Sequence, residues 1–221
     1  MEKYMNLKAI IFDMDGVILD SETISDKTWA IAQDEMEVST DKDYINMCRG
    51  TNRKDTLKIL GDVFGPDFDS EAFLNRTTEL FYMYEESQGI PLMPYAAQIL
   101  SYLKPKYRLA LASSTNGRAV ERQLTNAGVI DFFETRTTGE MVEHSKPDPE
   151  IYLMACEKIG VDPQNAFAIE DSYNGIRSAQ AGGLRAIMVP DLLPADDEMK
   201  ELAEVILPNL NDVIRYIETG M

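Results

Sequence analysis

The segment Ala9-Ile10-Ile11-Phe12-Asp13-Met14-Asp15-Gly16 joins four consecutive apolar residues to two aspartates and a glycine. A short unbroken apolar run is typical of a strand that is buried on both faces of a parallel sheet. The glycine allows the chain to turn tightly away after the strand. The segment therefore predicts a buried strand whose carboxyl end carries the carboxylates of Asp13 and Asp15.

Apolar runs and helical patterns alternate along the chain beyond Pro94. Strand candidates lie at 109–112, 166–169, 186–189 and 205–207, with a weaker one at 135–138. Helical patterns lie between them at 119–127, 150–159 and 175–181, and glycines follow as C-terminal stops. Alternation of this kind predicts an α/β fold, a three-layer Rossmann-like core in which helices cover a parallel sheet.

From Ser21 to about Gln88 the pattern is helical, and no convincing strand interrupts it. Asn52 and Ser70 are candidate N-caps there. Residues 89–94 indicate a linker, because each of their two prolines restricts the residue before it. We therefore expect an α/β core of residues 1–18 and 93–221, with an all-helical domain of residues 19–92 inserted after the first strand.

The charge balance limits the partners. The chain has 38 acidic and 21 basic residues, a formal net charge of −17. Nucleic acid binding relies on Lys and Arg side chains that neutralise phosphates, so this balance argues against nucleic acid, and anionic membranes are disfavoured similarly. A small anionic substrate stays compatible, because a divalent cation and a few basic groups can reverse the field inside one cleft.

Targeting and redox signals are sparse. No apolar stretch approaches the ~18 residues of a membrane span, and the N-terminal segment has no basic head before a long apolar stretch. We therefore expect a cytoplasmic protein, and a monomer, because the core and the insertion form a self-sufficient unit. Cys48 and Cys156 lie far apart without CxxC spacing, which predicts two buried, reduced thiols.

Polar side chains that suit phosphate or a hard cation lie after the strands or in loops. They are Asp13 and Asp15, then Ser113, Ser114 and Thr115, then Lys146 before a Pro-Asp-Pro segment, and finally Glu170 and Asp171. Ligands of open parallel sheets bind beyond the carboxyl ends of the strands. Acidic groups for Mg²⁺, hydroxyl donors for phosphate and one lysine together match the requirements of phosphoryl transfer.

Each of these elements alone has a commoner structural explanation. Aspartates near a glycine often form a turn, a Ser-Ser-Thr run often caps a helix, and a Glu-Asp pair often begins one. The single histidine, His144, has no second histidine with which to build a transition-metal site, and we expect a solvated loop residue. The joint placement of the other groups after successive strands is what favours a site.

The ordered motifs closely resemble the haloacid dehalogenase superfamily, specifically its branch of β-phosphoglucomutase-like phosphatases with a helical cap. The motifs are Asp13-Met14-Asp15-Gly16-Val17, Ser113 after an apolar strand, Lys146-Pro147, and Glu170-Asp171-Ser172 with Gly175. The likeness covers essentially the whole chain. The first motif alone is weak, but the ordered set is highly specific.

The resemblance implies a role for each of these residues. Asp13 would be the nucleophile that forms an aspartyl-phosphate, and Asp15 the acid that protonates the leaving group and later activates water. Ser113 and Lys146 would hold the phosphoryl group, with Ser114 as a further phosphate-binding candidate.

A Mg²⁺ ion is also implied by the resemblance. It would be bound by the Asp13 carboxylate, the backbone carbonyl of Asp15 and Asp171, with Glu170 helping directly or through water.

The resemblance also implies that the helical insertion is a mobile cap that excludes water and selects the substrate. Linkers near Leu19 and Pro91 are the expected hinges. Arg49-Gly50-Thr51-Asn52-Arg53 is similar to the family's substrate-specificity segment, so that Arg49 or Arg53 is expected to contact the substrate.

Three functions have to be weighed. A phosphatase passes the phosphoryl group from Asp13 to water, whereas a phosphosugar mutase passes it to a sugar hydroxyl. In such mutases a histidine follows the Asp-Ser/Thr segment, and here Ser25 takes that place, which favours a phosphatase of a small phosphorylated metabolite. A non-catalytic phosphate-binding protein would be expected to lack Asp13 or the metal carboxylates, and this chain keeps them. A phosphorylated sugar, a sugar acid or a nucleotide-derived monophosphate would suit such a site.

Overall fold

A parallel sheet forms the centre of the molecule in the computed structural model, which describes residues 6–49, 51 and 53–219. Across these residues, six parallel strands pair in the order β3-β2-β1-β4-β5-β6. They are β1 (Ala9–Phe12), β2 (Arg108–Ser113), β3 (Thr135–Thr138), β4 (Ala166–Glu170), β5 (Arg185–Met188) and β6 (Val205–Ile206). The predicted first strand is therefore central, paired with β2 on one side and β4 on the other.

Helices cover both faces of the sheet, as the α/β prediction requires. Helices α5 (Ala96–Leu103), α6 (Gly117–Asn126) and α10 (Leu210–Thr219) pack on one face, and α7 (Glu150–Ile159) and α8 (Tyr173–Ala181) on the other, with α9 (Asp197–Leu202) beside α8. Side chains alternate along β1, so that Ile10 and Phe12 join the first apolar cluster while Ala9 and Ile11 join the second. Burial on both faces explains the continuous apolar run.

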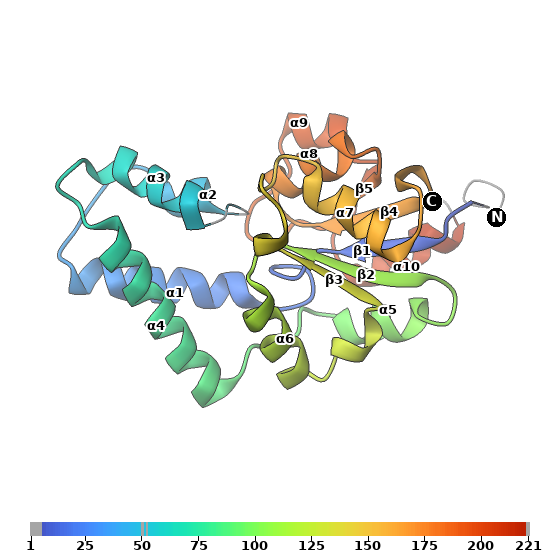
Figure 1. The fold of residues 1–221 in the computed structure, drawn as a ribbon, viewed down its shortest axis with the longest axis horizontal. Helices are drawn as coiled ribbons and strands as arrows, with labels where there is room; N and C mark the ends of the chain where they lie inside the picture. The colour runs from blue at the N-terminus through green and yellow to red at the C-terminus, as the bar shows by residue number, and fades with distance from the viewer. Residues whose placement is uncertain (1–5, 50, 52, 220–221) are drawn as a thin grey trace.

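The helical insertion lies to one side of the sheet (Figure 1). It consists of α1 (Ser21–Glu35), α2 (Tyr44–Cys48), α3 (Arg53–Phe64) and α4 (Ser70–Gln88). These helices have an apolar cluster of their own, which includes Tyr44, Leu60 and Phe73, and the Trp29 and Tyr44 rings stack with centroids 5.8 Å apart. This separate cluster supports the predicted two-domain division, whose boundaries stay a prediction.

Two short segments connect the insertion to the core, and they lie side by side. Leu19 forms an antiparallel bridge with Leu92. The backbone N–H of Asp20 donates to Pro91 O at 2.9 Å, and that of Met93 donates to Ile18 O at 2.9 Å. The predicted hinge positions thus fall on one two-stranded connection.

Some local predictions need correction. Ser70 is not an N-cap: it is the first residue of α4, and the Asp69 side chain accepts a hydrogen bond from the Ala72 N–H instead. Asn52, the other candidate cap, lies outside the described residues. Helices α5 and α10 were not predicted. The residue before α5, Tyr95, has a φ of 68° and no capping side chain, so the usual start signal is missing.

Cys48 and Cys156 are both free and buried, as predicted. Among the helices of the described residues, none has the length and apolar character that crossing a bilayer would take.

Candidate active site

The carboxyl ends of β1, β2 and β4 bring the predicted polar residues together. The Asp13 N–H donates to Ile169 O at 3.0 Å, which continues the ladder between β1 and β4 past the end of β1. The chain then turns sharply at Gly16, whose φ is 74°. A Cβ atom on Gly16 would lie 2.5 Å from Asp171 Oδ2, so a glycine is needed both for the turn and for the approach of Asp171.

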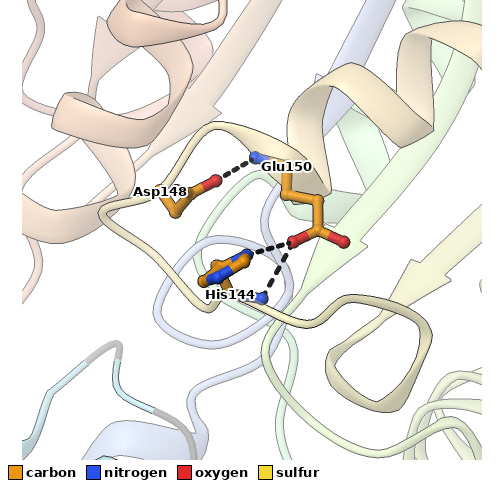
Figure 2. Close-up of side chains that lie close together, drawn as sticks. All are labelled: His144, Asp148 and Glu150. Carbon is orange, nitrogen blue, oxygen red and sulfur yellow. Dashed lines mark hydrogen bonds and ion pairs between the residues drawn. The ribbon is translucent and has the colours of Figure 1, made fainter.

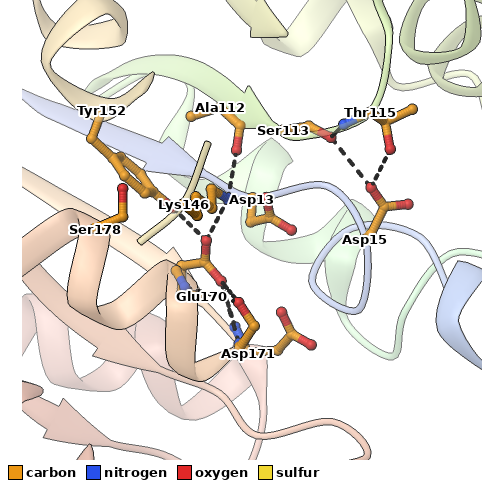
Figure 3. Close-up of polar contacts among 12 residues, drawn as sticks. Asp13, Asp15, Ala112, Ser113, Thr115, Lys146, Tyr152, Glu170, Asp171 and Ser178 are labelled. Atoms are coloured by element: carbon orange, nitrogen blue, oxygen red, sulfur yellow. Dashed lines mark hydrogen bonds and ion pairs between the residues drawn. The ribbon is translucent and has the colours of Figure 1, made fainter. Parts of the chain in front are cut away.

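Lys146 lies in the middle of this group and is only 3% exposed. Its Nζ atom donates to Asp13 Oδ1 at 2.6 Å, to Glu170 Oε1 at 2.6 Å and to Ala112 O at 3.2 Å (Figure 3). Burial disfavours the charged form, but Asp13 and Glu170 raise the pKa of Lys146 above its ordinary value. Lys146 is therefore a buried cation between two carboxylates and not a solvated loop residue.

Glu170 is fully buried, and its two carboxylate oxygens are both engaged. Oε1 accepts from Lys146 and from the Tyr152 hydroxyl at 2.7 Å. Oε2 accepts from the backbone N–H groups of Asp171 and Ser172 and from the Ser172 hydroxyl. A Cβ atom on Gly175 would lie 1.9 Å from Glu170 Cδ, so this glycine makes room for the carboxylate. These contacts make Glu170 a positioning partner of Lys146.

Asp15 is held by three hydroxyl groups. Its Oδ1 accepts from Ser21 Oγ at 2.6 Å. Its Oδ2 accepts from Ser113 Oγ at 3.2 Å and from Thr115 Oγ1 at 2.9 Å (Figure 3). Ser113 thus contacts Asp15, and Ser114 lies on the wall of the adjoining cleft. The structure therefore brings together the two motif aspartates, Lys146 and the predicted serines.

Three carboxylates gather next to Lys146. Asp13, Glu170 and Asp171 each offer an oxygen, and these oxygens lie within 4.8 Å of one another. Burial raises the pKa of Asp13 well above its ordinary value, as do Glu170 and Asp15, although Lys146 opposes this. Burial and the charges of Glu170 and Asp13 likewise raise the pKa of Asp171. A cluster of oxygen donors with one lysine beside it fits a hard divalent cation such as Mg²⁺.

A second group of possible metal-binding side chains lies on the loop before α7. The carboxylates of Asp148 and Glu150 lie beside His144 (Figure 2). Glu150 accepts hydrogen bonds from the backbone N–H groups of Glu143 and His144, and these bonds lower its pKa. His144 is exposed as expected, but its Nδ1 also lies 3.1 Å from Glu150 Oε2. The contacts stabilise the start of α7, which explains the group without a metal.

A cleft of about 350 Å³ lies between the sheet and the insertion. Both predicted cap arginines line it, but both are paired with acidic groups. Arg49 donates to Glu22 and Asp26 and is 8% exposed. Arg53 donates to Glu71 and is half exposed. Gly50 and Asn52 of the same predicted segment lie outside the described residues.

Several residues of the site were not predicted from the sequence. Tyr152 and Ser21 contact the charged centre, while Glu22, Asp26 and Gln123 line the cleft. Thr115, by contrast, belongs to the Ser-Ser-Thr run that the sequence predicts after the second core strand, and its hydroxyl donates to Asp15. The other residues lie within helices, where no motif separates them from ordinary helical positions.

Comparisons with known proteins agree on one family. The family model of haloacid dehalogenase-like hydrolases matches residues 10–189. Hexitol phosphatase B of Escherichia coli (strain K12) is 30% identical over 217 residues, which cover 93% of this chain and 93% of that protein. Beta-phosphoglucomutase of Bacillus subtilis (strain 168) is 26% identical over 217 residues, which cover 93% of this chain and 95% of that protein.

A solved structure matches the same fold. The crystal structure of a CbbY mutant from Rhodobacter sphaeroides in complex with xylulose-(1,5)bisphosphate has a TM-score of 0.77 and 26% sequence identity. The match covers 92% of this chain and 95% of that chain.

Proposed function

Because this chain belongs to the haloacid dehalogenase-like hydrolase family, we propose that it is a Mg²⁺-dependent phosphatase of a small phosphorylated metabolite. The substrate would be a sugar phosphate or a similar phosphomonoester. The observation that carries the proposal is the buried Asp13 carboxylate, which accepts a hydrogen bond from Lys146 and faces the open cleft beside Asp15. The similarity to hexitol phosphatase B supports the same reaction.

The proposed reaction has two displacements at phosphorus. A carboxylate oxygen of Asp13 attacks the phosphorus, the bond between phosphorus and the ester oxygen breaks, and the Asp15 carboxyl gives its proton to the departing alcohol. Asp15 then takes a proton from a water molecule as the water oxygen attacks the phosphorus. The bond to Asp13 breaks, which releases phosphate and restores the carboxylate.

Other side chains would position these groups. Lys146 holds Asp13 and offers positive charge where charge develops on the phosphoryl oxygens. Ser21, Ser113 and Thr115 fix the Asp15 carboxyl between the sheet and α1. Ser113 and Ser114 are also proposed to donate hydrogen bonds to the phosphate of the substrate.

Mg²⁺ would be held by the Asp13 carboxylate, the Asp15 backbone carbonyl and Asp171. The contacts of Glu170 favour an indirect role, because both of its oxygens already accept hydrogen bonds. When bound, the ion supplies positive charge that offsets the clustered carboxylates and polarises the phosphoryl group.

A phosphosugar mutase is the second candidate, supported by the similarity to beta-phosphoglucomutase. The cleft argues for the phosphatase instead. Ser25 of α1 lines the cleft where the mutase histidine is expected, and the only histidine of the chain, His144, is on an exposed loop. A non-catalytic phosphate-binding role is a third and weaker candidate, since Asp13, Asp15 and Lys146 are all in place.

The test is phosphate release from a panel of phosphorylated metabolites, with and without Mg²⁺, while isomer formation is followed in parallel. Asp13→Asn removes the proposed nucleophile, and Asp131→Asn makes the same change at an exposed position remote from the cleft. We expect Mg²⁺-dependent release that Asp13→Asn abolishes and Asp131→Asn keeps. Isomer formation without net release would instead identify a mutase. Activity that survives Asp13→Asn would refute the mechanism.

A further inference from the structure

Arg49 donates to two carboxylates and one amide oxygen. Its Nε donates to Asn46 Oδ1 at 2.8 Å, one terminal nitrogen donates to Glu22, and the other donates to both Asp26 oxygens at 2.6 and 2.7 Å. Glu22 and Asp26 are four positions apart on α1, so their carboxylates lie on one face of the helix and meet the guanidinium together.

This arrangement leaves no net positive charge on the group formed by Arg49, Glu22 and Asp26. The guanidinium carries one positive charge at any pH near neutrality, and Asp26 and Glu22 carry up to two negative charges. Burial raises the pKa of Glu22 to about 7, with Arg49 opposing. The trio therefore has a net charge between zero and −1 whichever form Glu22 takes.

The remaining cations on the cleft wall are also paired. Arg53 donates to Glu71 and Asn75, and Lys146 belongs to the catalytic group. A second phosphate or a carboxylate on the substrate would therefore meet a group whose net charge lies between zero and −1, in a partly desolvated space. An anion that is desolvated without a cationic partner binds unfavourably.

The rest of the wall suits neutral hydroxyl groups. Gln123 of α6 is 5% exposed and lines the cleft, and within the described part of the chain its Oε1 has no hydrogen-bond partner. An amide side chain both accepts and donates, as a sugar or polyol hydroxyl requires. The wall also carries Trp29, Phe81 and Tyr82, whose rings can pack against C–H groups of such a compound.

We propose that Glu22 and Asp26 determine specificity by neutralising Arg49, so that the cleft accepts monophosphates of neutral polyhydroxylated compounds and rejects substrates with a second anionic group. The inference rests on the proposed phosphatase function. It adds to that function the number of charges that the substrate carries.

Matched substrate pairs test it on the unmodified protein. Fructose 1-phosphate and fructose 6-phosphate are compared with fructose 1,6-bisphosphate, and glucose 6-phosphate with 6-phosphogluconate. We expect kcat/KM to be at least about tenfold higher for the singly anionic member of each pair. Equal or better turnover of the bisphosphate and of 6-phosphogluconate would overturn the inference while the phosphatase function stood.

A binding measurement tests the charge selection separately from the proposed phosphatase function. Calorimetric binding of the same pairs to Asp13→Asn with Mg²⁺ requires no turnover, so it reports on charge selection even if the proposed reaction is wrong. Tighter binding of the bisphosphate than of either monophosphate would overturn the inference. Weaker binding would support it.

A double variant that leaves the Arg49 charge without its carboxylate partners tests the roles of Glu22 and Asp26 directly. Glu22→Gln with Asp26→Asn removes both carboxylates from Arg49, whereas Glu35→Gln with Glu79→Gln removes both carboxylates from the exposed Arg76. We expect the preference for monophosphates to fall by roughly fivefold or more in the first variant and to persist in the second. A folded first variant with an unchanged preference would show that Glu22 and Asp26 do not set specificity.

Discussion

The Nζ atom of Lys146 donates a hydrogen bond of 2.6 Å to Asp13 Oδ1, although 133 positions separate the two residues in the chain. The loop after β3 therefore places the Lys146 ammonium group beside the carboxyl end of β1. This bond is made between buried groups, where electrostatic interactions are strong because little water screens them. It is the contact on which the proposed chemistry depends most directly.

Lys146→Met should remove the cation and keep most of the apolar stem. We expect kcat to fall by about 100-fold or more, the scale seen when one preorganised donor to a developing charge is lost. Steady-state phosphate release measures the effect, with circular dichroism to confirm folding. Lys104→Met, an exposed lysine of the same domain, is the control and should leave kcat unchanged. A folded Lys146→Met protein with nearly full activity would contradict the proposed role.

Tyr152→Phe should destabilise the fold by removing a donor to Glu170. The Tyr152 hydroxyl is buried and donates at 2.7 Å to an oxygen that Lys146 also contacts. A hydrogen bond to a charged group contributes about 1.5 to 3 kcal/mol, so we expect the free energy of unfolding to fall by about that amount. Urea titration measures it. Tyr173→Phe loses a hydroxyl that donates to Pro194 O nearer the surface and should cost less.

The strands and the charged centre could be predicted from the sequence because both have local signals. The apolar run before Asp13 lacks alternation because it is buried on both faces, but its short length and the glycine that follows it favour a strand over a buried helix. Motif residues follow the strand ends directly, and parallel strands bring those ends to one edge. Even the weak candidate at Thr135–Thr138 is a strand, held in place by pairing with β2.

The cleft wall could not be predicted in the same way. Glu22 and Asp26 have the spacing that is common on any solvated face of a helix. They pair with Arg49 only because the fold places Arg49, which follows α2, beside them. The sequence around Tyr152 indicates an ordinary core residue of α7, and its hydrogen bond to Glu170 is visible only in the folded structure. In each case the partner comes from a distant element, so the relationship exists only in the folded chain.

Arg122→Met should loosen the closed arrangement of insertion and core. Arg122 of α6 forms two hydrogen bonds, of 2.7 and 2.8 Å, with Glu85 of α4, whose side chain is 4% exposed. Removing the arginine leaves a buried carboxylate without this partner, so we expect KM to rise about threefold to tenfold and proteolysis near residues 89–93 to accelerate. Arg118→Met on the same helix is exposed and should change neither. An unchanged KM would show that the contact between Arg122 and Glu85 does not help to hold the insertion against the core.

The pH dependence of stability should report on Glu22. Burial raises its pKa in the folded state to about 7, above the ordinary value of 4.5, so the folded protein holds a proton that the unfolded chain has lost. Stability therefore falls as the pH rises between these two values and then levels off. Glu22→Gln cannot titrate, so the unfolding free energy of the variant minus that of the unmodified protein should grow by about 2 kcal/mol from about pH 5.5 to about pH 8. A difference that stays constant with pH would show that Glu22 titrates normally.

Asp171→Asn should have opposite effects on the metal-free and the metal-bound protein. Burial and the charges of Glu170 and Asp13 raise the pKa of Asp171, which means that ionising this carboxyl costs more in the folded protein than in the unfolded chain. Removing that charge should stabilise the protein in the presence of a chelator. The same change removes a proposed Mg²⁺ ligand.

Thermal unfolding with chelator and with Mg²⁺ distinguishes the two effects. A ligand that binds only the folded state raises the unfolding temperature by mass action, so Mg²⁺ should stabilise the unmodified protein strongly. For Asp171→Asn we expect a higher unfolding temperature in chelator, a smaller rise with Mg²⁺, and at least about a tenfold increase in the Mg²⁺ concentration that supports half-maximal activity. Asp196→Asn keeps an acceptor at the N-cap of α9 and lies outside the carboxylate cluster, so it should leave the response of the unfolding temperature to Mg²⁺ unchanged. If Mg²⁺ stabilised Asp171→Asn as much as the unmodified protein, the ion would have to bind through other residues, because a lost carboxylate ligand cannot leave its affinity intact.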